Sequence, residues 1–516
     1  MSPTTFPELL PATDANARLR ANVHPDDYQN PTPQERYHLV VLGAGTAGLV
    51  AASVAAGLGA KVALVERRLM GGDCLNVGCV PSKGVIAAAR AAAAVRDACR
   101  FGVNVPGGFS VDFAAAMDRM RTLRADISPH DSVERFAEKG VDVFLGEARF
   151  TDDATVSVAG PAGDVTLRFR RAVIATGGRA AAPPIPGLDT VDYLTNETVF
   201  SLTEAPGTLA VVGGGPIGCE LAQALARLGS RVTLFVDEHG VFPRDDEGVA
   251  PVLTAALERD GVQLVGGGRE LSVAPGEAGG LGGGVLVNGP HGQTLADQLL
   301  VAVGRAPNVA GLGLEAAGVV FDPSKGVRVD DRLQTTSSRI YAAGDVCSAA
   351  KFTHAADFQA RTVVRNALMP WPANRGKATS LVIPWCTYTS PEVAGVGLTE
   401  REASRRSVPV DAYRIDLAEV DRSLLEGETE GFVKVLTAAG SDTIVGATIV
   451  APNAGDMIGE VSLAMTHGVG LGKVASAIHP YPTVAEAIRK LGDQYNRTRF
   501  TPTLQAVLRR WFAWTG

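Results

Sequence analysis

Residues 39–66 read LVVLGAGTAGLVAASVAAGLGAKVALVE, and this stretch decides the fold. An apolar run that ends at Leu42 is followed by three closely spaced glycines, an alanine-rich segment and a second apolar run that closes on Glu66. The two apolar runs predict strands, and the alanine-rich segment between them predicts a helix. The stretch therefore predicts a parallel strand–helix–strand unit, from which α/β folds are built.

The glycines of this unit have the spacing of a dinucleotide-binding turn. Gly43 allows the tight turn after the strand, Gly45 lets a phosphate approach the backbone, and Gly48 lets helix and strand pack closely. The start of the helix offers free N–H groups and the positive end of its dipole to phosphate. Glu66 follows about twenty residues on, where a carboxylate accepts hydrogen bonds from ribose hydroxyls.

A second unit of the same kind begins at Leu209. The segment 209–218 reads LAVVGGGPIG, so that Gly213, Gly215 and Gly218 repeat the spacing of the first turn, and a helix and a strand follow through Val236. Two such units in one chain predict binding sites for two dinucleotides.

Composition limits the class of protein. A chain of 516 residues, 46% hydrophobic and 20% charged, is expected to be a soluble globular enzyme with three or four domains. Its net charge of -7 gives no basic surface for nucleic acid. Six cysteines are too few for a disulfide scaffold and Met1–Arg36 does not read as a secretory signal, so we expect a cytoplasmic location. Leu39–Ala60 is uncharged, but its glycines at turn spacing argue against a membrane helix.

A cysteine pair lies between the two units. Residues 72–83 read GDCLNVGCVPSK, which places Cys74 and Cys79 five positions apart at the start of a predicted helix. As zinc ligands they would need a second pair nearby, and the other cysteines are scattered singly. A glycine-rich turn is a poor place for an inert buried thiol, and a helix start favours the reactive thiolate. A redox-active pair is the favoured interpretation.

The order of these motifs resembles the pyridine nucleotide-disulfide oxidoreductases, which include glutathione reductase, dihydrolipoamide dehydrogenase and mercuric reductase. The resemblance covers roughly residues 37–493. It implies an α/β fold with two Rossmann-like domains, one for FAD and one for NAD(P), and an α+β C-terminal dimerisation domain. The implied parts are an N-terminal extension at 1–36, the FAD domain at 37–180 and 298–370, the inserted NAD(P) domain at 181–297, the dimerisation domain at 371–493, and a tail at 494–516. We expect the extension to be an irregular arm.

The resemblance also implies roles for the cysteine pair and its neighbours. Cys79 would be the sulfur against the flavin, and Cys74 the sulfur that meets the acceptor. Lys83 and Glu220 match a family ion pair beside the reactive edge of the flavin, where a cation would stabilise the negative charge that reduction builds.

Further FAD contacts follow from the same resemblance. Asp345 would hold the ribityl chain, and a helix that opens at Thr353 and His354 would direct its dipole at the pyrimidine side of the ring. The remaining implied contacts are Thr176, Gly177 and Gly304.

The choice of nicotinamide nucleotide depends on the end of the second strand of the second unit. The position equivalent to Glu66 is Val236, and Asp237 and Glu238 come next. NADP recognition usually needs a basic residue here, and the next one along the chain is Arg244. Two carboxylates would repel a 2'-phosphate, so the sequence slightly favours NADH.

Residues 478–486 read IHPYPTVAE and bear on the acid–base group. Disulfide reductases of the family carry a His-Pro-Thr motif followed by Glu, which supplies a histidine from the partner subunit. Aligning Pro482, Thr483 and Glu486 with this motif puts Tyr481 at the histidine position, as in mercuric reductases, and leaves His479 as the alternative. The resemblance therefore implies a homodimer with Tyr481 and Glu486 in a shared site.

Electrons would pass from NAD(P)H through FAD and the cysteine pair to a small acceptor: a disulfide, a thiophilic metal ion or a quinone-like molecule. Mercuric reductase-like activity is the first expectation, and dihydrolipoamide dehydrogenase activity is the alternative. Mercuric reductases carry an extra N-terminal metal-binding domain and vicinal cysteines near the C-terminus; we expect neither here, since no cysteine follows Cys386. Both departures count against mercury detoxification. An NADH oxidase or quinone reductase that needs no Cys74, and a redox sensor without turnover, are the rival classes.

The tail carries a short amphipathic pattern. Leu504, Val507, Leu508 and Trp511 share one helical face, with Arg509 and Arg510 beside it. Such a helix can dock on its own chain or its dimer mate, which is the favoured interpretation, or lie on a membrane surface.

Overall fold

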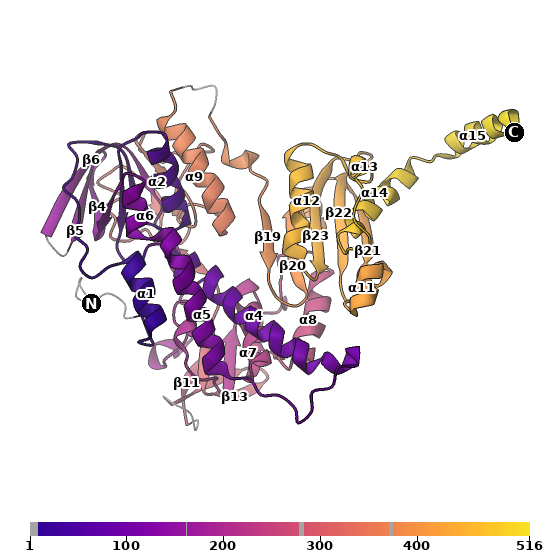
Figure 1. Cartoon of the computed structure of the whole chain (residues 1–516), viewed down its shortest axis with the longest axis horizontal. Coiled ribbons are helices and arrows are strands. Elements are labelled where there is room, and N and C mark those ends of the chain that lie inside the picture. The colour runs from indigo at the N-terminus through magenta and orange to yellow at the C-terminus, as the bar shows by residue number, and fades with distance from the viewer. Residues whose placement is uncertain (1–8, 161–162, 278–282, 371–374) are drawn as a thin grey trace. The chain divides into compact units, whose positions relative to one another are not determined.

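The computed structural model describes residues 9–160, 163–277, 283–370 and 375–516, shown in Figure 1. The chain forms two compact units: one joins the residues up to Glu238 with Gly261–Leu381, and the other joins His239–Asp260 with Val382–Gly516. Residues 1–8 of the expected N-terminal extension and the expected domain start at residue 371 lie outside the described ranges. None of the helices in those ranges has the length and apolar character that a membrane crossing requires.

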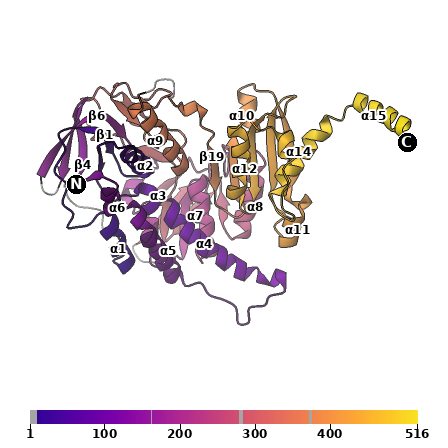
Figure 2. The same cartoon turned by 45° about the horizontal axis from the view of Figure 1, so that its top comes forward.

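The first nucleotide-binding unit forms the centre of a seven-stranded sheet with the order β3-β2-β1-β6-β5-β4, and β18 pairs with β6. Its strands are β1 (Tyr37–Leu42), β2 (Val62–Glu66), β3 (Val141–Leu145), β4 (Glu147–Asp152), β5 (Thr155–Gly160), β6 (Gly163–Ile174) and β18 (Ile340–Ala342). Val41 lies between Leu64 and Val173 in parallel register. The alanine-rich segment forms α2 (Thr46–Gly57), which packs against α9 (Thr353–Leu368), as Figures 1 and 2 show.

The second nucleotide-binding unit forms a parallel four-stranded sheet with the order β10-β9-β8-β14. Its elements, together with an antiparallel three-stranded sheet that follows in the chain, are β8 (Thr208–Val212), α7 (Pro216–Arg227), β9 (Arg231–Phe235), β10 (Gln263–Val265), β11 (Ser272–Gly276), β12 (Gly284–Gly289), β13 (Gly292–Ala296) and β14 (Gln298–Val301). Both parallel sheets confirm the α/β prediction.

The helices around the cysteine pair are short or polar on one side. They are α3 (Gly72–Asn76), α4 (Cys79–Arg96), α5 (Phe113–Ile127) and α6 (Val133–Glu138). Helix α4 contacts both α5 and α7, so the two nucleotide-binding parts meet along it.

The second compact unit is an antiparallel sheet with the order β19-β20-β23-β22-β21, covered by helices. Its elements are β19 (Pro384–Thr387), β20 (Glu392–Gly397), β21 (Val410–Asp416), β22 (Phe432–Ala438), β23 (Ile444–Ala451), α8 (Val249–Arg259), α10 (Glu400–Arg405), α11 (Asp421–Glu426), α12 (Ala454–Thr466), α13 (Leu471–Val474), α14 (Glu486–Thr498) and α15 (Pro502–Thr515). The sheet and helices confirm the α+β domain.

Helix α8 belongs to this unit although its sequence lies in the expected NAD(P) domain. Ahead of it, Asp246 receives a 2.8 Å hydrogen bond from the buried Lys434, and Asp245 receives one of 3.0 Å from the indole of Trp385. A buried lysine needs such a counter-charge, which fixes the segment to the sheet.

The N-terminal extension is not an irregular arm: its described part contains the helix α1 (Asp14–Val23). Thr13 caps this helix by accepting a hydrogen bond from Asn16 N, and Leu19 and Val23 are fully buried in the first core. Leu19 and Val23 are the only large apolar residues of the helix, with Ala15 one turn before them. Packing rather than a strong amphipathic pattern therefore stabilises the helix.

Candidate functional site

The first glycine turn has the close contacts that its spacing predicts. Gly43 has φ +99°, and a Cβ there would lie 2.5 Å from the carbonyl oxygen of Ala175. A Cβ on Gly48 would lie 1.8 Å from the carbonyl oxygen of Gly43. Gly45 begins α2 without a side-chain cap, so the first N–H groups of the helix face outward as a phosphate cradle. These residues fit the diphosphate of FAD.

Glu66 ends β2 and is hydrogen-bonded to this turn. Its buried carboxylate accepts 2.7 Å hydrogen bonds from the N–H groups of Ala44 and Arg68. Burial raises the pKa of the Glu66 carboxyl, and the backbone donors oppose that shift. The position is the one from which a carboxylate binds an adenosine ribose, and this contact stays a prediction.

The cysteine pair is present as two thiols at the junction of α3 and α4. A hydrogen bond from the Cys74 thiol lowers the pKa of Cys79 to about 6, with further help from the Thr353 hydroxyl and the Lys83 charge. The same hydrogen bond, followed by burial, raises the pKa of Cys74. Near neutral pH we therefore expect Cys79 to be the thiolate and Cys74 to be the thiol that donates a hydrogen bond to it.

Thr353 and Lys83 reach Cys79 from different elements. The Sγ of Cys79 lies 3.4 Å from the Oγ1 of Thr353, the first residue of α9, whose N-terminus has no side-chain cap. Lys83, one turn along α4, forms a 2.9 Å ion pair with Glu220 of α7, 137 positions away. The Glu220 side chain is only 7% exposed, so its charge depends on this partner. The structure thus brings Lys83 and Glu220 together, as the resemblance implied.

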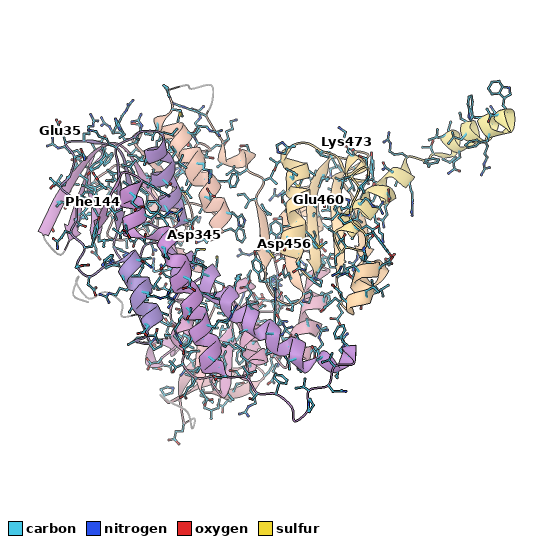
Figure 3. The ribbon with its side chains drawn as sticks, in the orientation of Figure 1. Glu35, Phe144, Asp345, Asp456, Glu460 and Lys473 are labelled. Atoms are coloured by element: carbon cyan, nitrogen blue, oxygen red, sulfur yellow. The ribbon has the colours of Figure 1, made fainter. Side chains whose placement is uncertain are left out.

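Asp345, labelled in Figure 3, is paired with a residue that the sequence analysis missed. The Nε of Arg305 lies 3.1 Å from its carboxylate, and the same guanidinium contacts Asp73 in the cysteine turn. Burial raises the pKa of Asp345, and Arg305 opposes that shift. The string GRAPN at 304–308, directly after a strand, is the signal that could have identified this arginine. The contact of Asp345 with a ribityl chain stays a prediction.

Residues 304–308 are also hydrogen-bonded to the turn that contains Thr176 and Gly177. The Thr176 hydroxyl donates to the Asn308 carbonyl at 2.7 Å, and the Asn308 amide donates back to the Thr176 carbonyl at 2.9 Å. Next to them β7 (Gly178–Ala180) pairs with β15 (Arg305–Pro307). Gly177 has φ +65°, and Gly304 φ +133° with open space around it. His354 is exposed and stacks on Phe352, with ring centroids 5.4 Å apart.

A pocket of about 380 Å³ adjoins Cys79 between α4 and α5. Its lining includes Val80, Lys83, Arg119, Leu123 and Ile127. Apolar side chains form most of this lining, and the two basic groups are its charged members. No group of three or more His, Cys, Asp or Glu side chains that could hold a metal ion occurs in the described ranges.

The second glycine turn also begins a helix without a side-chain cap: Gly215 precedes α7 and has open space around it. At the end of β9, however, a basic side chain from a later segment lies beside the two carboxylates. Arg269 follows β10 and lies 3.4 Å from the Asp237 carboxylate and 3.5 Å from that of Glu238. The local pattern offers only Arg244, the next base along the chain, because contacts across a sheet are not visible in it.

His479 and Tyr481 have different surroundings in the second unit. The His479 ring lies 2.9 Å from a carboxylate oxygen of Glu460, labelled on α12 in Figure 3, and its side chain is 9% exposed. Tyr481 is 68% exposed and donates a 2.9 Å hydrogen bond to Asp421, which raises the pKa of the phenol. Glu486 pairs with Arg489 at 2.9 Å rather than with Tyr481.

Comparisons with known proteins agree with this geometry. Residues 37–360 match the family "Pyridine nucleotide-disulphide oxidoreductase", and residues 383–491 match its dimerisation domain. Mercuric reductase of Bacillus cereus is 36% identical over 88% of this chain and 70% of its own, and dihydrolipoyl dehydrogenase of Bacillus subtilis (strain 168) is 32% identical over 88% and 96%.

Two solved structures share the fold. LpdA of Mycobacterium tuberculosis has a TM-score of 0.80 at 26% identity, covering 89% of this chain and 99% of its own. The Cu(II) complex of the HOCl-induced flavoprotein disulfide reductase RclA of Escherichia coli has a TM-score of 0.78 at 26% identity, covering 89% and 100%. The chain therefore belongs to the pyridine nucleotide-disulphide oxidoreductase family, whose members are enzymes that use FAD and NAD(P)H.

Proposed function

We propose that this chain is a homodimeric flavoprotein that transfers electrons from NAD(P)H through Cys74 and Cys79 to a thiophilic metal ion. The observation that carries the proposal is the acidic thiol of Cys79, held by a hydrogen bond from Cys74 beside an open pocket. FAD, when bound, would accept a hydride from NAD(P)H and supply two electrons at the cysteine pair.

The side chains of this chain are suited to a soft cation. The Cys79 thiolate would bind the ion directly, and Cys74 would release its proton to solvent as its sulfur becomes the second ligand. The Lys83–Glu220 pair would keep a positive charge beside the thiolate. This sequence needs no imidazole to carry protons.

The surroundings of His479 support a metal ion over a disulfide as the electron acceptor. A disulfide reductase has to protonate leaving thiolates, and an imidazole does this well near neutral pH. In this chain both ring nitrogens of His479 are hydrogen-bonded, Nε2 to Glu460 and Nδ1 to the Ala477 carbonyl, while the exposed group at the aligned position is the Tyr481 phenol. Dihydrolipoamide dehydrogenase activity is the second candidate, supported by the 32% identity with that enzyme.

The test is anaerobic reduction of the FAD-loaded enzyme by NADH or NADPH, followed by metal ions, quinones and disulfides as acceptors. We expect Hg²⁺ or Cu²⁺ turnover that falls at least a hundredfold in Cys74→Ala and Cys79→Ala. Turnover with quinone or oxygen that survives Cys74→Ala would instead identify an oxidase or quinone reductase. Reduction by NAD(P)H without turnover of any acceptor would identify a sensor.

A further inference from the structure

The C-terminal helix α15 has an apolar face with no cover in the structure. It spans Pro502–Thr515, begins with a proline and is capped by the Thr501 hydroxyl, which accepts from Leu504 N. None of its residues is buried. Val507, Trp511, Phe512 and Trp514 are each more than half exposed. Burial within its own compact unit therefore does not account for these side chains.

The six large apolar side chains lie on one side of the helix, where the terminal Thr515 is the one polar residue among them. At about 100° per residue, they cover an arc of roughly 160°. They are Leu504, Val507, Leu508, Trp511, Phe512 and Trp514. Arg509 and Arg510 lie one on each flank of this arc. The rings of Trp511 and Trp514, 5.6 Å apart, lie side by side on it.

Charge distinguishes this segment from the rest of the protein. Residues 494–516 contain four arginines and no acidic residue, in a chain with a net charge of -7. A helix of 14 residues is about 21 Å long, too short for the hydrocarbon core of a bilayer but long enough to lie along its surface. Isolated helices of this length are marginal in water, so this one requires a docking surface.

We propose that α15 docks on the surface of an anionic lipid bilayer. The tryptophans and Phe512 would enter the boundary between headgroups and acyl chains, and Arg509 and Arg510 would contact lipid phosphates. A second copy of α15 is a poorer occupant, because it would bring the arginines of both chains together. This inference is independent of the acceptor that the enzyme reduces.

The experiment is flotation of the FAD-loaded full chain with vesicles of phosphatidylcholine alone or with 30% phosphatidylglycerol, read by flavin absorbance. We expect binding to the anionic vesicles that 0.5 M NaCl weakens. At low salt, Arg509→Gln with Arg510→Gln lowers vesicle affinity about 25-fold, from about fivefold per charge. Trp511→Ala with Trp514→Ala lowers it more than tenfold. The matched controls Arg509→Lys with Arg510→Lys, and Thr503→Ala with Gln505→Ala, retain binding.

Light scattering on the same proteins tests the other occupants. We expect the chain truncated after Arg499 to keep the mass of the full-length dimer and to lose flotation. A truncated chain of half that mass would show that α15 docks on the second copy and would overturn the proposal. Absent flotation, or equal and salt-independent binding to both vesicles, would overturn it as well.

Discussion

The two sulfurs of the active pair differ in acidity because one donates a hydrogen bond to the other. With FAD bound, we expect Cys74→Ser to show a long-wavelength band of the Cys79 thiolate against oxidised flavin, since serine keeps a donor at this position. The thiolate forms as pH rises, so the band should grow through a pKa of about 6. Cys74→Ala removes the donor and should move that midpoint to higher pH. A band that survives Cys79→Ser in a pH titration would show that the sulfur roles are reversed.

Arg269 should decide how well the enzyme accepts NADPH. Its guanidinium balances Asp237 and Glu238, and without it two carboxylates would face a 2'-phosphate. We expect Arg269→Ala to lower kcat/KM for NADPH at least tenfold, about 1.4 kcal/mol, and for NADH less than threefold. Steady-state kinetics with both nucleotides measure this, with Arg269→Lys as the control that keeps the charge. Equal losses for the two nucleotides would refute a role at the 2'-position.

The wild-type preference is a separate measurement. Because both carboxylates remain beside the single arginine, we expect NADH to be accepted at least as well as NADPH. A kcat/KM tenfold higher for NADPH would reject the charge argument.

Tyr481 is the residue that should separate metal-ion from disulfide chemistry. A phenol with a raised pKa is a poor base near neutral pH, whereas an imidazole titrates there. Tyr481→His should therefore gain lipoamide or glutathione reduction and lose metal-ion turnover. Efficient lipoamide turnover by the unmodified chain, lost in His479→Ala, would instead place His479 at the site.

At the scale of elements, α1 supports the cysteine turn through α5. Arg124 of α5 donates 2.7 Å hydrogen bonds to the Asn16 side chain of α1 and to the Asn76 carbonyl between the two cysteines. Burial, with a smaller contribution from the charge of Arg121, lowers the pKa of Arg124 to about 10. A buried guanidinium needs hydrogen-bond acceptors of this kind.

Asn16→Ala should consequently destabilise the fold by about 1.5–3 kcal/mol, because a buried charged donor loses its acceptor. The free energy of unfolding from a denaturant titration measures this. Arg18→Ala on the same helix is the control: its ion pair with Asp126 is more than half exposed on both sides and should contribute under about 1 kcal/mol. Equal effects of the two substitutions would contradict the support by α1.

The sequence predicted those elements whose signal is local. Both glycine turns and the helices after them follow from residues close together in the chain, whereas the start of α9 at Thr353 was expected from the family resemblance. The contacts of Arg305, Arg269 and Arg124 could not be predicted in this way, because the partners Asp73, Asp237 and Asn16 lie 232, 32 and 108 positions away. Helix α1 was missed for a related reason: it is held by polar contacts and two apolar side chains rather than by a long amphipathic pattern.

At the scale of the whole molecule, the family match to a dimerisation domain supports a homodimer, and the proposed site takes Cys79 from one chain and Tyr481 from the other. We expect hybrid dimers, with Cys79→Ser on one chain and Tyr481→Ala on the other, to regain about half of the wild-type activity, since one of two sites is complete. Tandem purification with two tags isolates these dimers. Hybrid activity no higher than that of the parent variants would show that each site is built from one chain.

The packing of α2 against α9 has a consequence during synthesis. The apolar surface of α2 is complete by Gly57, but the helix that covers it ends at Leu368. At about 5–20 residues per second, a ribosome needs roughly 15–60 s to make the intervening chain. During that time α2 has no α9 to cover it, and the first sheet lacks β18, the strand that pairs with β6. Newly made chains should therefore depend on chaperones until α9 leaves the ribosome tunnel.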